Sequence, residues 1–187
     1  PLLRLGFGPR LIYLVGGYES VAGEVSTVLA YDAVLDSWCE VASMATKRHL
    51  HSAAALGGKL YVMGGTDDGD TTLDQAEVYD PKADSWQPLP SMPTARHCLA
   101  AAAVAGKIYA IGGVGIDDKL CNAVEAYDPI SGAWTRVASL PMARSHHAAT
   151  VIGGKIYVLG GFQHADPDDD DNPDHDDDNN PDQDRVH

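Results

Sequence analysis

The feature that most constrains the fold is a repeat with a constant step of 48 residues. Double glycines mark it at Gly16-Gly17, Gly64-Gly65, Gly112-Gly113 and Gly160-Gly161. Further series keep the same step and register: Tyr13, Tyr61, Tyr109 and Tyr157; Tyr31, Tyr79 and Tyr127; Trp38, Trp86 and Trp134; and Arg48, Arg96 and Arg144. Independent series in one register do not arise by chance, and a period of this size is typical of solenoids, propellers and arrays.

One period, residues 48–95, predicts four short strands. Apolar or alternating runs cover residues 51–56, 60–63, 75–79 and 85–89. Gly57-Gly58 and Asp80-Pro81 between them are turn signals, and no pattern of helical period appears. Four antiparallel strands in a repeat of this length indicate a blade of a β-propeller, so the fold class that we predict is all-β.

The segment "RHLHSAAALGGKLYVMGG…AEVYDPKADSWQPLPSMP" resembles a kelch repeat, which combines a double glycine, a tyrosine and a spaced tryptophan. The similarity extends from about Leu11 to Phe162, in three nearly complete copies and part of a fourth. The opening "GPRLIYLVGGY" also resembles the first repeat of the kelch domain in BTB–BACK–kelch (kelch-like) adaptors. Because the marker residues recur in every blade, we interpret them as structural: glycines at strand ends, tryptophans and arginines between blades.

The number of blades predicts a partial propeller. Residues 11–163 supply about three and a half four-stranded blades, because residues 11–45 hold only the last three strands of the first blade. Closed propellers need at least four blades. Residues 1–10 do not resemble a strand, and we interpret them as a linker. We therefore expect an excerpt of a longer protein, a truncated sequence, or a half-propeller that associates with a copy of itself.

The charge is concentrated in residues 164–187. The net charge of the chain is −14, and the segment from Asp166 onward carries 11 aspartates against one arginine, Arg185. We expect a disordered tail that repels itself, with calcium binding as the less favoured alternative. The remainder is nearly balanced, which argues against nucleic acid as a partner.

Composition also limits the compartment. The chain has three cysteines without a CxxC motif, which favours free, buried or half-buried thiols and a cytoplasmic location. No apolar run reaches the roughly 18–20 residues that a membrane span needs, and the N-terminal residues lack the apolar core of a signal peptide.

Function is expected on the face where the loop after the second strand meets the loop before the first strand of each blade. There the resemblance implies a partner-reading role for residues that follow the double glycines and the recurrent arginines. At the positions after the recurrent arginines, adaptors for acidic partners present further arginines, whereas this chain has His, Leu and Cys. A strongly acidic ligand is therefore disfavoured. The residues that we expect to contact a partner are Tyr18, Glu19, His49, Thr66, Asp67, His97, Val114, Ser145, His146 and Phe162.

The sequence does not predict catalysis. It has no GxSxG, no phosphate-binding loop and no Cys–His pair at a known spacing. We interpret the histidines as loop or blade-interface residues and expect no metal and no cofactor. The resemblance implies a protein-interaction module, as the substrate-recognition part of a cullin-RING ubiquitin ligase adaptor. The alternatives are an actin-binding cytoskeletal scaffold and a bacterial-type enzyme or sugar-binding propeller.

Overall fold

The structure, a computed structural model, describes residues 11–21 and 23–163, and every regular element in this part of the chain is a β-strand. The strands are β1 (Leu11–Glu19), β2 (Gly23–Asp32), β3 (Ser37–Val41), β4 (Ser52–Leu56), β5 (Lys59–Met63), β6 (Ala76–Asp80), β7 (Ser85–Leu89), β8 (Ala100–Val104), β9 (Lys107–Ile111), β10 (Val124–Asp128), β11 (Ala133–Arg136), β12 (Ala148–Ile152) and β13 (Lys155–Leu159). Two predictions, a linker at residues 1–10 and a disordered acidic tail at residues 164–187, lie outside the described residues.

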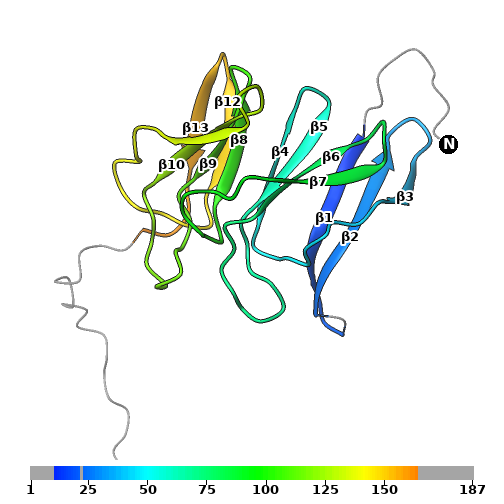
Figure 1. Ribbon diagram of the computed structural model, residues 1–187, viewed down its shortest axis with the longest axis horizontal. Helices are drawn as coiled ribbons and strands as arrows, with labels where there is room; N and C mark the ends of the chain where they lie inside the picture. Colours follow the sequence, from blue (N-terminus) through cyan, green and yellow to red (C-terminus); the bar gives the residue numbers. More distant parts are fainter. Residues whose placement is uncertain (1–10, 22, 164–187) are drawn as a thin grey trace, which may run out of the picture.

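The strands form four antiparallel sheets in chain order. The sheets are β1-β2-β3, β4-β5-β6-β7, β8-β9-β10-β11 and β12-β13. They stand side by side like blades, with the inner strand β8 in contact with both β4 and β12 (Figure 1). The prediction of an all-β partial propeller is confirmed, and each predicted strand of residues 48–95 lies within one residue of an observed one.

The first blade differs in one respect from the repeat pattern. We expected each double glycine to end the second strand, but β1 continues through Gly16-Gly17 to Glu19. A register shift between Val15 and Gly17 absorbs the glycines as a bulge. The strand continues because a tight hairpin follows it, whereas long loops follow the double glycines of the next two blades.

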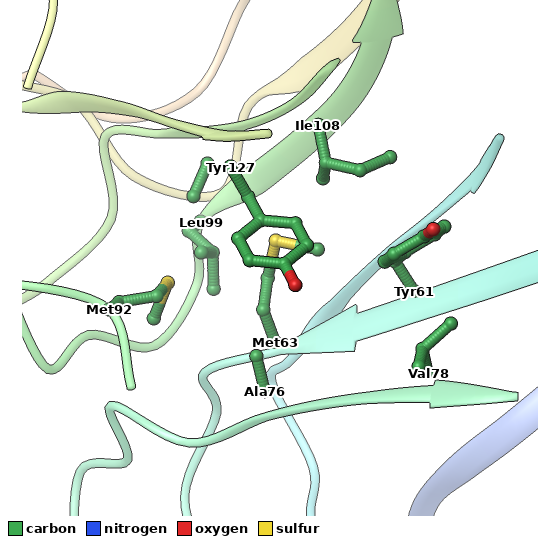
Figure 2. Close-up of a cluster of buried hydrophobic side chains, with 9 residues drawn as sticks. Tyr61, Met63, Ala76, Val78, Met92, Leu99, Ile108 and Tyr127 are labelled. Carbon is green, nitrogen blue, oxygen red and sulfur yellow. The ribbon is translucent and has the colours of Figure 1, made fainter. Parts of the chain in front are cut away.

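Neighbouring blades pack through alternating side chains of their second strands. In the second blade, Leu60 and Val62 contact the preceding blade, whereas Tyr61 and Met63 contact the following one. Figure 2 shows the second of these cores, in which Tyr127 of the third blade lies near Met63. Each blade therefore has a back face, toward the preceding blade, and a front face, toward the following one.

Tryptophan strengthens the first two internal interfaces as expected. The indole Nε1 of Trp86 donates to the Ala42 carbonyl of the preceding blade at 2.7 Å, and Trp134 donates to the Pro90 carbonyl at 2.8 Å. Trp38, in the first described blade, is more than half exposed. The tryptophan series thus joins blades rather than building a binding pocket.

Double glycines are needed where blades approach closely. Gly64 has a φ of +65°, and a Cβ there would lie 2.4 Å from the carbonyl oxygen of Arg96. Gly57, in the β4–β5 turn, has a φ of +60° and open space around it. Of these two glycines, only Gly64 combines a left-handed backbone with a steric barrier to a side chain.

This pair makes a testable prediction. Gly57→Ala should cost about 1 kcal/mol, because only the left-handed backbone is penalised. Gly64→Ala should cost about 2 kcal/mol more, because the added methyl group also pushes adjacent blades apart. Urea unfolding of the two variants measures the difference, and equal losses would contradict the role assigned to close packing.

Candidate binding face

Short backbone bridges join the loops of one face. His49 pairs with Thr66, His97 with Val114, and Ser145 with Phe162, so the segment before each first strand meets the segment after each second strand. The β1–β2 hairpin and the β5–β6 connection reach the lower side of the view in Figure 1. We name this side the loop face. The turns at Gly57-Gly58 and at residues 129–132 lie on the opposite side, because strand direction alternates within each sheet.

Tyr18 and His49 form the first cluster of the loop face. Their ring centroids lie 5.8 Å apart, and Tyr18 is 65% exposed. The Nδ1 atom of His49 lies 3.1 Å from the Thr66 hydroxyl and 3.5 Å from a Glu24 carboxylate oxygen. The imidazole is thus held from two sides, and the tyrosine ring above it faces solvent. Glu19, at the end of β1, is also exposed.

His97 forms the centre of the face. Its Nδ1 lies 3.3 Å from the Thr72 hydroxyl, and its backbone pairs with Val114. Burial lowers the pKa of His97, Asp118 raises it, and the rings of His146 and His49 lower it further. The three loop-face histidines of successive blades therefore lie within electrostatic range of one another.

The third cluster joins His146 and Phe162. Their rings meet edge to face at 5.5 Å, and Phe162 is largely exposed. The Ser145 hydroxyl lies 3.1 Å from Nδ1 of His146, which orients the imidazole. The face thus presents aromatic–imidazole pairs at both of its ends.

Backbone hydrogen bonds between Leu50, Cys98 and His146 link the three clusters across the blades. The Cys98 N–H donates to the Leu50 carbonyl at 2.8 Å, and the His146 N–H donates to the Cys98 carbonyl at 3.0 Å. All three adopt a left-handed backbone, with φ values of 52°, 52° and 53°. This conformation is unusual for such side chains, and the hydrogen bonds across the blades hold it in place.

Cys98 and His146 form a pair that the sequence analysis missed. The Sγ and Nε2 atoms lie 3.1 Å apart. The sequence did contain a signal for this pair, since the two residues are separated by one full repeat of 48 positions. Equivalent positions of adjacent blades are neighbours near the inner strands. Burial raises the pKa of the Cys98 thiol, which disfavours the thiolate and hence nucleophilic chemistry.

Several predicted contact residues support the face from below. Thr66 and Ser145 are buried, so their side chains are not available to a large partner. Asp67 is committed to its own loop, because its Oδ1 accepts the N–H groups of Gly69 and Thr71, both at 3.0 Å. These hydrogen bonds, from Thr71 first and then Gly69, hold the pKa of Asp67 below its ordinary value. The exposed part of the predicted set is Tyr18, Glu19, His146 and Phe162.

The two fully buried arginines of the series correct our expectation that they act between blades, because their side chains bond within their own blades. Each is paired there with a glutamate, which sequence reasoning also missed. Arg48 lies 2.8 Å from Glu77, and Arg96 lies 2.7 Å from Glu125. The glutamates themselves are one repeat step apart, so the sequence held a signal for them. Because the arginines are occupied inside the fold, they do not offer positive charge to a ligand.

The remaining chemistry of the described residues is limited. Within residues 11–21 and 23–163, no group of three or more His, Cys, Asp or Glu side chains is arranged to hold a metal. All three cysteines are free, but Cys39 is exposed on β3, which corrects our expectation of buried or half-buried thiols. Its Sγ lies 3.6 Å from the Ala30 carbonyl oxygen of β2, and the residue is exposed on β3, the outer strand of its sheet. No helix in the described part of the chain could span a membrane.

Fold and loop face together define a repeat protein of the β-propeller class. Residues 8–167 match the family described as the KLHDC2/KLHL20/DRC7 Kelch-repeats domain, and the chain belongs to this kelch-repeat family. The resemblance to kelch repeats is thus confirmed. A search among curated proteins gave no match. Membership of a kelch-repeat family supports a role as a protein-interaction module.

Proposed function

We propose that the chain recognises a protein or peptide segment on the loop face and performs no catalysis. The observation that carries this proposal is the exposure of Tyr18 and Phe162, each in contact with an imidazole that neighbouring side chains orient. Rigid aromatic side chains on positioned loops are suited to partner recognition. The partner segment is not strongly acidic, because Arg48 and Arg96 are neutralised inside the fold.

Alanine substitutions at Tyr18, His146 and Phe162 test the face. Quantitative affinity capture from cell extract should show at least a tenfold loss of the wild type's specific partners, because rigid aromatic anchors contribute most of the binding energy. The matched control replaces Val34 and Ile130, two exposed apolar residues of turns on the opposite side, with alanine. Loss of partners in the control, or retention by the loop-face variant, would assign binding to another surface.

We further propose that the recognised protein is a substrate of a cullin-RING ubiquitin ligase for which this chain belongs to the adaptor. Support comes from the kelch-repeat family and from the resemblance of the repeats to kelch-like adaptors. Expression of the loop-face variant in place of the wild type should lengthen the half-life of the captured partner. An unchanged half-life would leave partner binding intact as a proposal and remove the ubiquitin role.

We also propose a cytoplasmic location, supported by three free cysteines. Imaging of a fluorescent fusion tests this location.

Self-association is a separate proposal, since it depends on the blade faces at the two ends of the array rather than on the loop face.

A further inference from the structure

Within residues 11–21 and 23–163, the first and last blades each leave one packing face uncovered. In the first blade, Ile12 and Leu14 of the back face are 60% and 57% exposed. In the last described blade, Tyr157 and Leu159 of the front face are 44% and 56% exposed. The side chains on the other face of the same strands, such as Tyr13 and Val158, pack into the cores between blades.

The internal interfaces show what covers such faces. Leu60 and Val62 are the repeat equivalents of Ile12 and Leu14, and the first blade buries them. Tyr61 and Met63 are the equivalents of Tyr157 and Leu159, and the third blade buries them. A front face is therefore built to receive a back face of the same repeat, and the described part of the chain presents one exposed copy of each.

The uncovered back face is already arranged for docking. At the internal interfaces, the strand-two tyrosine of one blade meets the strand-three tyrosine of the next, as in Tyr13–Tyr79 at 5.8 Å and Tyr61–Tyr127 at 6.3 Å. Tyr31 is the equivalent acceptor in the first blade. Its ring packs on Trp38 at 5.1 Å and its hydroxyl donates to Asp36, as Tyr79 does with Trp86 and Asp84.

We propose that two copies of this chain associate head to tail, with the front face of one last blade packed on the back face of the other first blade. Tyr157 then meets Tyr31 of the second copy, and Leu159 meets Ile12 and Leu14. The contact is heterologous, so it generates a closed ring or a longer array, depending on the rotation between copies. It continues the internal blade packing between molecules, since apolar faces of this kind mark association sites.

Mass in solution tests the proposal. At roughly 100 μM, well above a micromolar Kd, sedimentation should give a dimer or larger species for the wild-type chain. Leu14→Asp and Leu159→Asp should each be monomeric, because one half of the interface is lost. Ile130→Asp, at an exposed apolar position of an outer turn, is the matched control and should associate like the wild type.

A mixture of the two variants distinguishes head-to-tail packing from symmetric packing. The intact front face of Leu14→Asp can still receive the intact back face of Leu159→Asp, so the mixture should form a dimer that neither variant forms alone. Ile12→Asp and Tyr157→Lys provide a second pair if circular dichroism shows that either variant is unfolded. A monomeric wild type would overturn the proposal. Association that survives either single substitution would overturn it as well.

Discussion

Replacing Arg96 with methionine is expected to reduce the free energy of unfolding by about 3–5 kcal/mol, because the buried Glu125 carboxylate loses its only fully buried arginine partner. Its other arginine partner, Arg136, lies 3.5 Å away and is largely exposed. Arg96 and Glu125 are both fully buried and lie 2.7 Å apart. Arg96 also donates to the carbonyl oxygens of Gly112 and Ala123, which would lose their donor. Urea unfolding measures the loss, which is a large part of the stability of a typical domain.

The repeat supplies the control for this experiment. Arg144 occupies the equivalent position in the last blade, where it donates to the Gly160 carbonyl at 2.9 Å and has no carboxylate partner among the described residues. Arg144→Met should therefore cost less than about 1 kcal/mol. The double variant Arg96→Met, Glu125→Met should recover much of the loss, because no charge is left unpaired. Equal effects of the Arg96 and Arg144 substitutions would contradict the importance of the buried pair.

Stability is expected to fall between pH 7.5 and pH 4.5 because the half-buried His51 is held in its neutral form, with its Nδ1 atom shielded from solvent. Burial lowers the pKa of His51 to about 4, and the positive charge of Arg48 acts in the same direction. The Nδ1 atom has no hydrogen-bond partner. In the unfolded chain the imidazole takes up a proton near its ordinary pKa of 6.5. The contribution of neutral His51 to the free energy of unfolding is thus complete above pH 6.5 and is lost as the pH falls toward 4.

His51→Leu should remove this dependence. Leucine is a fitting replacement, because Leu99 occupies the equivalent position of the next blade and is buried there. Between pH 7.5 and 4.5 the wild type should lose about 2–3 kcal/mol more than the variant. Urea titrations of both proteins at the two pH values give this difference. The effects of the other titratable groups cancel in the comparison, because both proteins contain them. The same loss in both proteins would show that His51 is not the source.

The regular part of the fold was predictable because the repeat marks it many times over. The strands of residues 48–95 follow from alternating apolar residues and glycine turns, which are local signals that one period suffices to show. The first blade was harder to predict, because the strand β1 continues through Gly16-Gly17. A double glycine permits either a loop or a bulge, and only the hairpin that follows selects between them.

The binding face was predictable in its location and less so in its accessible residues. Tyr18 and Phe162 are exposed at the positions that the repeat register indicates. Thr66 and Ser145 follow from the same register but are buried. Thr66 is the repeat equivalent of the exposed Phe162, so the register alone does not determine exposure. Position along the strand is a local property, whereas burial depends on the loop that covers the residue.

By itself the sequence determined the all-β blades, their order and the loops that meet on one face, since these depend on a period repeated along the chain. Only the tertiary structure showed that Arg96 is paired with Glu125, that Cys98 lies against His146, and that opposite faces of the end blades are left uncovered. These contacts join residues 29 or 48 positions apart, or depend on which blade lies beside which. The Arg96–Glu125 pair forms inside one blade, where the folded sheet brings β10 to the segment before β8. The Cys98–His146 contact and the exposed end faces depend on the packing of blade on blade, which no single repeat specifies.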